Sequence, residues 1–168
     1  MIFVTVGTNE APFDRLLAAF DSLDLDEKLV IQCGASSLRP SGAECVDFIS
    51  FDELVTHVRA ARVVVTHAGV GSVAVALTNE KRPIVVARRS RFGEAVDDHQ
   101  LAFARRFAAS GQVRLVEDLD ELSAMLRDGE DNASGHSHGS GGSLAAELRA
   151  FIGAAVASQT PRSVANLR

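Results

Sequence analysis

Short apolar runs recur along the chain, and most are followed by a loop and a segment whose apolar residues have helical spacing. The run at 63–65 (VVV) does not alternate with polar residues, which is typical of a parallel strand covered on both faces. Regular alternation of strands and helices predicts a Rossmann-like three-layer α/β/α domain with a mostly parallel sheet. The predicted strands are 2–6, 28–33, 45–49, 63–65, 83–87 and 113–116, and the predicted helices are 12–23, 51–61, one from about 70–72, 97–110 and 118–127.

This pattern ends near residue 127 and divides the chain into three parts. Residues 1–127 are predicted to form one domain. Residues 128–143 (DGEDNASGHSHGSGGS) contain no apolar side chain larger than alanine, which predicts a flexible loop. His136 and His138 lie within it and are interpreted as part of a solvated spacer rather than a metal site. Residues 144–168 are predicted to be a helix and tail that pack on the same domain or on a partner.

Composition narrows the choice of partner and compartment. With 168 residues and 46% hydrophobic content, the chain can bury one sizeable core. A net charge of −5 excludes a general basic field for nucleic acid. Cys33 and Cys45 lack CxxC spacing and are expected to be core thiols in a reducing compartment, and no metal site is predicted. The first residues read as a strand rather than a signal peptide, and we expect a cytoplasmic protein.

The turn at 67–72 (HAGVGS) carries the strongest chemical signal. It follows a buried strand and opens a helix, and its two glycines leave backbone N–H groups uncovered. A helix that begins there would direct its unpaired N–H groups and the positive end of its dipole at one spot, which favours an anion such as phosphate. The alternative is that the glycines serve close packing alone. Neither the P-loop pattern nor the complete GxGxxG fingerprint is present.

Three motifs in order resemble a known family: VGT after the first strand, THAGVGS in the middle, and DDHQLAFARRF after the next strand. They resemble the UDP-sugar-binding half of GT-B glycosyltransferases of the MurG and Alg13 type, glycosyltransferase family 28. The loop RRSRFGEAVDDHQ is more narrowly similar to that of bacterial two-subunit polysaccharide glycosyltransferases. The resemblance covers residues 1–127 and implies the C-terminal half of a GT-B fold.

The resemblance implies a role for each matching position. A first loop faces the diphosphate of the nucleotide sugar, a central turn receives the pyrophosphate, and a third segment reaches the donor sugar and ribose. The UDP-sugar is the donor substrate, and no separate cofactor is implied. In this order the matching residues are Gly7, Thr8 and Asn9; His67, Ala68, Gly69, Gly71 and Ser72; and Asp98, His99 and Gln100.

One position departs from the family pattern. Relatives carry a glutamate in the helix after the HAG turn that holds the ribose hydroxyls, and this chain has Val75 there. Glu80 lies more than one helical turn further on, near the predicted end of the helix, and should not substitute. Pyrophosphate binding is therefore better supported than uridine recognition.

Sugar transfer needs stabilisation of the departing diphosphate and a base for the acceptor hydroxyl. The amides of residues 69–72 and Arg88 are candidates for the first task, and Arg88 in a solvated loop is the alternative. An arginine of this loop would also suit the carboxylate of a glucuronic acid donor. His67 is the candidate base, and a structural role that fixes the turn is the alternative.

The resemblance implies the donor-binding catalytic subunit of a two-component glycosyltransferase. Such a hexosyltransferase would move a sugar such as GlcNAc or glucuronic acid from a UDP-sugar to a lipid-linked or polysaccharide acceptor. It would act only with an Alg14-like membrane-anchored subunit, which would hold it at the inner face of the membrane. The alternatives are a non-catalytic module that binds UDP-sugar or nucleotide, and an interaction domain without a ligand.

Overall fold

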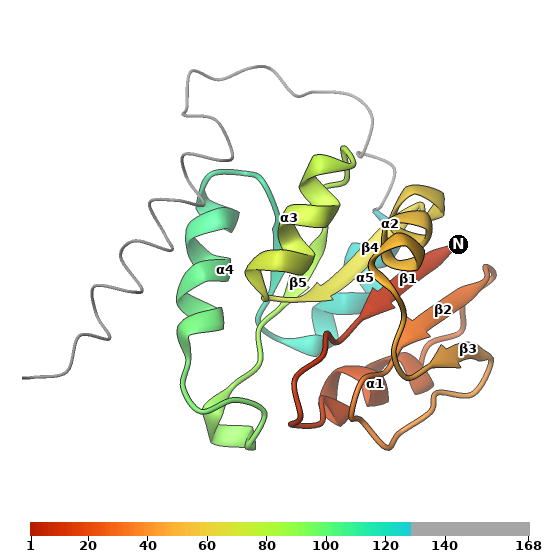
Figure 1. Cartoon of the computed structure of the whole chain (residues 1–168), viewed down its shortest axis with the longest axis horizontal. Coiled ribbons are helices and arrows are strands. Elements are labelled where there is room, and N and C mark those ends of the chain that lie inside the picture. Colours follow the sequence, from red (N-terminus) through yellow and green to blue (C-terminus); the bar gives the residue numbers. More distant parts are fainter. Residues whose placement is uncertain (129–168) are drawn as a thin grey trace, which may run out of the picture. The chain divides into compact units, whose positions relative to one another are not determined.

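The centre of the fold is a parallel sheet of six strands in the order β3-β2-β1-β4-β5-β6 (Figure 1). The computed structural model describes residues 1–128. The predicted parts at 128–143 and 144–168 lie outside the described residues, except for Asp128. The strands are β1 (Ile2–Thr5), β2 (Leu29–Gln32), β3 (Ala43–Val46), β4 (Val63–His67), β5 (Ile84–Val86) and β6 (Arg114–Val116).

Helices cover both faces of the sheet, which confirms the predicted three-layer, Rossmann-like architecture. In Figure 1, α2 and α3 lie on one face and α1 and α5 on the other. Two short 3₁₀ turns, Ser90–Phe92 and Leu119–Glu121, interrupt the later loops. The helices are α1 (Asp14–Asp21), α2 (Phe51–Ala60), α3 (Val70–Thr78), α4 (His99–Ala109) and α5 (Leu122–Arg127).

Each face of the sheet has its own apolar cluster, because alternate residues of a strand point to opposite faces. Val4 and Ile31 belong to the cluster with the buried residues of α1 and α5, whereas Phe3 and Val30 pack with Val58 of α2 and the helix α3. All four residues of β1 are buried. The unbroken apolar runs of the sequence are thus explained by cover on both sides.

The third strand ends earlier than predicted. β3 is Ala43–Val46 rather than 45–49. The carbonyl of Asp47 turns to accept hydrogen bonds from the Gly34 amide at 2.8 Å and the Gln32 side chain at 2.8 Å. Ser50 then caps α2 in a capping box with Glu53. These contacts leave residues 47–50 as a connection at the end of the sheet instead of a strand.

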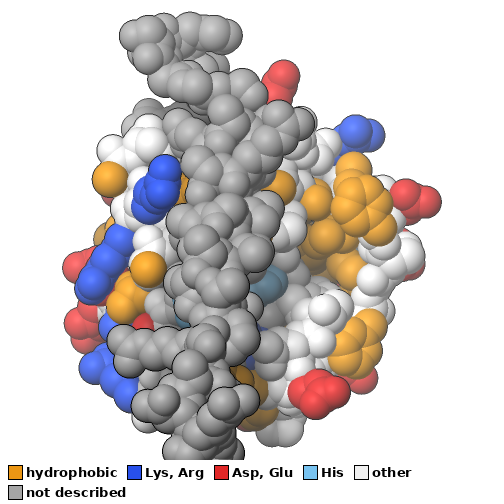
Figure 2. All heavy atoms as spheres, turned by 60° about the vertical axis from the view of Figure 1, so that its left-hand side comes forward, with side chains coloured by type: hydrophobic (Ala, Val, Ile, Leu, Met, Phe, Trp, Pro, Cys, Tyr) orange, Lys and Arg blue, Asp and Glu red, His pale blue; other side chains and the backbone are white. Residues whose placement is uncertain are grey.

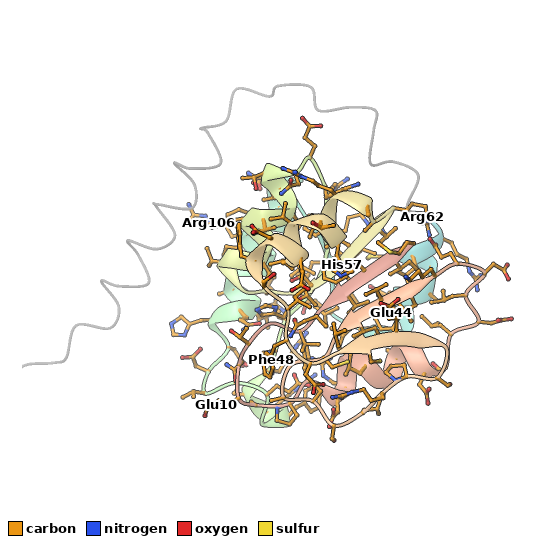
Figure 3. The ribbon with its side chains drawn as sticks, turned by 45° about the vertical axis from the view of Figure 1, so that its right-hand side comes forward. Glu10, Glu44, Phe48, His57, Arg62 and Arg106 are labelled. Carbon is orange, nitrogen blue, oxygen red and sulfur yellow. The ribbon has the colours of Figure 1, made fainter. Side chains whose placement is uncertain are left out.

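The strand order reverses between β1 and β4, which lie side by side in register from Ile2 and Val63 to Thr5 and Thr66. In open α/β sheets the ligand crevice forms outside the carboxyl ends of strands at such a reversal. Figure 3 shows Phe48 beyond the end of β3 on that side, and Arg62 at the opposite end of the sheet. The topology therefore fixes where a site is expected.

Candidate active site

A cavity of about 410 Å³ lies where the strand order reverses, beyond the carboxyl ends of β1, β2 and β4. Its lining has two parts, which we call its two ends. The first comprises the loops after β1 and β4 and the first turn of α3, and the second is the segment that enters α2. Exposed hydrophobic side chains gather on the face shown in Figure 2. The lining residues are Thr5, Gly7, Thr8, Gln32, Ile49, Ser50, Phe51, Leu54, His67, Gly69, Gly71 and Ser72.

The His67 ring is held between two glycines. A Cβ atom on Gly7 would lie 2.4 Å from Cε1 of His67, and one on Gly69 would lie 2.2 Å from Nε2. Real Cβ atoms essentially never come so close, so both positions need glycine for the ring to lie where it does. Gly7 also has a φ of +78°, a backbone conformation that by itself favours glycine. These glycines place the imidazole between the loops that follow β1 and β4.

Burial lowers the pKa of His67 to about 4. The nearby positive charge of the Arg88 guanidinium is a smaller cause of this low pKa, and the Thr5 carbonyl acts against both causes. That carbonyl is near enough to favour the charged ring, but Nδ1 is buried without a hydrogen bond of normal geometry. His67 is therefore a neutral imidazole at physiological pH.

This pKa predicts how stability depends on pH. Unfolded His67 takes up a proton below about pH 6.5 while the folded ring stays neutral, so acid favours the unfolded chain. Relative to a His67→Gln variant, the wild-type protein should lose at most about 3 kcal/mol of unfolding free energy between about pH 7.5 and 4. Urea titrations of both proteins across that range measure the difference, in which the carboxyl groups and other histidines cancel. A constant difference would contradict the low pKa.

The first turn of α3 presents backbone amides to the cavity. Gly69 is the N-cap residue and makes no side-chain capping bond. The Val73 amide donates to the Gly69 carbonyl at 3.0 Å as the helix begins, so the amides of residues 70–72 precede the intrahelical ladder. Gly71 and Ser72 line the cavity, and a Cβ atom on Gly71 would meet nothing within 4 Å. The positive end of the helix dipole and uncovered N–H groups thus point into open space.

The second end of the cavity is apolar. Ile49, Phe51 and Leu54 line it together with Ser50. Phe51 is 67% exposed and Phe48, outside the cavity, is 61% exposed. The cavity therefore joins an anion-accepting end to an end suited to a flat apolar group.

Arg88 lies in the interior, not on the cavity surface or in a solvated loop. Its side chain is fully buried. Nη1 donates to the carbonyls of Ala11, Pro12 and Glu94 at 2.8, 3.2 and 3.2 Å, and Nη2 donates to the Val6 carbonyl at 3.0 Å. The guanidinium also lies 4.7 Å from the centre of the Phe13 ring. Three of these four bonds hold the loop after β1, and Nε is buried without a hydrogen-bond partner. The expected direct contact of Arg88 with a sugar donor is therefore corrected to a supporting position behind that loop.

The segment Asp98–Gln100 lies at the start of α4 and does not line the cavity. The Asp98 carboxylate accepts hydrogen bonds from the Ser90 amide at 2.9 Å and its hydroxyl at 3.1 Å. The His99 side chain is half exposed, and its Nδ1 lies 2.5 Å from Oδ1 of Asp97. Oε1 of Gln100 accepts from the Arg88 amide at 3.3 Å. These contacts organise residues 88–100 as one loop.

Two other predicted residues lie beside the cavity without lining it. The Asn9 side chain accepts a hydrogen bond from the Ala11 amide at 2.8 Å, and Ala68 is buried. Val75 packs against the apolar cluster between the sheet, α2 and α3. Glu80 lies beyond the C-terminal end of α3, as expected, and has a φ of 60°.

The residues that the sequence analysis missed are Thr5, Gln32 and the segment Ile49–Leu54. Gln32 reads as the polar end of an apolar strand, and its burial to 3% exposure is a tertiary effect. The capping box at Ser50 was recognisable, and the rule that ligands bind at carboxyl ends of strands could have drawn attention to the residues beside it.

Within residues 1–128 no three potential metal-binding side chains gather at one place. No helix in that range is long and apolar enough to cross a membrane. Cys33 is buried and Cys45 half-buried, and both are free thiols. Burial raises the pKa of Cys33 to about 12, in keeping with a core thiol.

A doubly wound parallel sheet with a helix N-terminus and an apolar wall at its switch point defines a nucleotide-binding type of α/β domain. Comparison with known proteins identifies the family of this domain. The Glycosyltransferase family 28 C-terminal domain matches residues 1–147, and the chain belongs to this family. This confirms the resemblance drawn from the three motifs.

Individual relatives agree with that assignment. Over 120 residues the chain is 34% identical to the UDP-N-acetylglucosamine transferase subunit ALG13 of Eremothecium gossypii, covering 69% of this chain. It spans 57% of that protein's length. Two solved GT-B glycosyltransferases share the fold. The glycotransferase of kitacinnamycin has a TM-score of 0.55 and a sequence identity of 23%. The match covers 93% of this chain and 39% of the glycotransferase chain. The glycosyltransferase SnogD from Streptomyces nogalater has a TM-score of 0.53 and a sequence identity of 20%. The match covers 79% of this chain and 35% of the SnogD chain.

Proposed function

We propose that this chain is the donor-binding subunit of a glycosyltransferase that uses a UDP-sugar. The observation that carries the proposal is the cavity at the switch point, whose lining combines the first turn of α3 with an apolar wall. Membership of family 28 supports a nucleotide-sugar donor. The similarity to a UDP-N-acetylglucosamine transferase subunit favours UDP-GlcNAc, with UDP-glucuronic acid as the other candidate.

In the proposed complex the diphosphate lies at the first turn of α3, where Gly69, Gly71 and Ser72 can supply backbone N–H groups. Gly7 and Thr8 face it from the loop after β1. The uracil ring lies against Ile49, Phe51 and Leu54, because a flat base fits an apolar wall better than a charged group does. Asn9, Ala68 and the segment Asp98–Gln100 remain candidates for contacts beyond the cavity, toward the sugar.

Transfer breaks the bond between the anomeric carbon and the diphosphate as the acceptor hydroxyl attacks that carbon, and negative charge grows on the departing UDP. The helix amides would stabilise this charge, and the buried positive charge of Arg88 would add to the potential from behind the loop. No protein metal site enters the scheme. A pKa near 4 makes His67 a weak base, so we favour a neutral hydrogen-bonding role beside the diphosphate and a base from the acceptor side.

The acceptor side is proposed to be a second subunit. The relative from Eremothecium gossypii is itself named as a subunit of a transferase, which supports this proposal. We propose an Alg14-like, membrane-anchored partner that presents a lipid-linked or polysaccharide acceptor at the inner face of the membrane. A module that binds UDP without catalysis is the other candidate, because the partly buried Val75 packs against an apolar cluster at the position where the family resemblance implies a ribose-binding glutamate.

Titration calorimetry with UDP tests the donor site, and Gly71→Asp and Gly71→Asn form a matched pair. Both side chains have room because a Cβ atom there meets nothing within 4 Å, and a carboxylate near a helix N-terminus does not harm the helix. Repulsion of the diphosphate should make UDP bind at least about tenfold more weakly to Gly71→Asp than to Gly71→Asn. Uridine, which has no phosphate, should bind both variants alike. Equal UDP affinities, or no saturable binding by the wild-type chain, would contradict the proposal.

A further inference from the structure

Gln32 lies under the cavity, and its side chain is 3% exposed at the carboxyl end of β2. Oε1 accepts hydrogen bonds from the Thr5 hydroxyl at 2.6 Å and from the Gly7 amide at 3.1 Å. Nε2 donates to the Gly7 carbonyl at 3.0 Å and to the Asp47 carbonyl at 2.8 Å. A glutamine amide has two donor hydrogens and two acceptor lone pairs, so these four bonds use its full capacity.

These bonds reach the two ends of the cavity. Gly7 belongs to the loop that packs against His67 and faces the first turn of α3. Asp47 begins the connection that leads to Ile49 and Phe51, the apolar wall. Gly7 is held through its N–H and its C=O, which belong to two successive peptide groups, so neither group can rotate without breaking a bond to Gln32. One buried side chain therefore ties the anion-accepting loop to the segment that carries the apolar wall.

We propose that Gln32 is a positioning residue that sets the spacing between the diphosphate end and the base end of the donor cavity. The inference rests on the proposed function, since it assumes that one ligand occupies both ends. A ligand that spans both ends gains from correct spacing, because the second contact then forms without further loss of freedom. A fragment that fills one end gains nothing from it.

The test compares UDP, which would span both ends of the cavity, with fragments that fill only one end. Gln32→Glu keeps the size and the two acceptor contacts but sets a carboxylate oxygen against the carbonyls of Gly7 and Asp47. Gln32→Met removes all four bonds. Ile31→Val, in the same strand but in the core on the other face of the sheet, is the control for general loss of stability. Binding of UDP is measured by calorimetry, and binding of uridine and inorganic pyrophosphate by NMR titration.

Both Gln32 variants should bind UDP at least about tenfold more weakly, because a misplacement of about 1 Å can have effects up to a hundredfold. Uridine and pyrophosphate should each change less than about threefold, and Ile31→Val should bind UDP like the wild-type protein. The proposal is overturned if the fragments weaken as much as UDP, if UDP binding is unchanged, or if Ile31→Val shows the same loss. Gln32→Glu decides the result if Gln32→Met does not fold.

Amide hydrogen exchange in the ligand-free protein separates this inference from the proposed function. The Gly7 amide should exchange at least about tenfold faster in Gln32→Met, because it loses Oε1 of Gln32 as an acceptor and keeps only the longer bond to the Thr5 hydroxyl at 3.3 Å. The Val6 amide, which donates to the backbone carbonyl of Gln32 at 3.1 Å, is the internal reference and should not change. Failure of the wild-type chain to bind UDP would contradict the donor site, whereas unchanged protection of Gly7 would overturn the positioning role by itself.

Discussion

Arg88→Met should lower the free energy of unfolding by about 4 kcal/mol, the largest loss expected from any single substitution considered for this chain. The change leaves the carbonyls of Val6, Ala11, Pro12 and Glu94 without the guanidinium that donates to them. Methionine fills much of the space but offers no donor, so the bonds to Val6 and Glu94, which are buried, and those to Ala11 and Pro12, which are partly buried, are all lost. Denaturant titration measures the loss.

Arg91→Met is the matched control. Arg91 lies in the same loop, is exposed, and has a ring contact with Phe92 at 4.6 Å. Its replacement should change stability by less than about 0.5 kcal/mol. Equal stability of the two variants would show that Arg88 does not hold the loop. The stability of Arg88→Lys should lie between the stabilities of these two variants. One ammonium group cannot donate to all the carbonyls that the two Nη groups of the arginine fork reach.

Gly69→Ala should abolish measurable UDP binding and destabilise the protein by about 1 to 3 kcal/mol. The new methyl group would lie 2.2 Å from Nε2 and 2.8 Å from Cδ2 of His67. The backbone is not the cause, since φ is −79° and ψ is 131° at this position, which suits alanine. With Gly7 against the same ring, the imidazole must move into the cavity. Calorimetry with UDP and thermal unfolding report the two effects.

Two further variants isolate this contact. Gly71→Ala adds the same methyl group two residues later, where nothing lies within 4 Å, and should keep or raise stability by up to about 1 kcal/mol. In a His67→Ala background, Gly69→Ala should cost less than about 0.5 kcal/mol, because the ring that it strikes is absent. If the cost of Gly69→Ala is the same with and without His67, the clash is not its origin.

The fold could be predicted from the sequence because its information is local. Apolar runs such as the one at 63–65 and the helical spacing after each loop mark the elements, and six strands in alternation with helices leave few arrangements. The turn at 67–72 was predicted as a helix start, and the structure begins α3 at Val70. The early end of β3 was missed because Asp47 turns toward partners in another strand.

The supporting side chains of the site could not be predicted in the same way. An arginine after an apolar run is usually exposed, and nothing near Arg88 in sequence shows that carbonyls 76 to 82 residues away need a donor. Gln32 presents the same difficulty, since its partners in Gly7 lie 25 residues away. Motifs identify the groups that face a ligand, whereas the groups behind them are fixed by tertiary contacts.

The parallel pairing of the sheet has a consequence for how the protein folds. The loop after β1 is held by side chains from β2 and from the end of β5, so no single βαβ unit contains the finished site. Contacts between such distant residues form late, since the cost of closing the intervening chain comes before their gain. We therefore expect the cavity to be complete only after the folding transition state. A ligand that binds there would slow unfolding while leaving the rate of folding nearly unchanged.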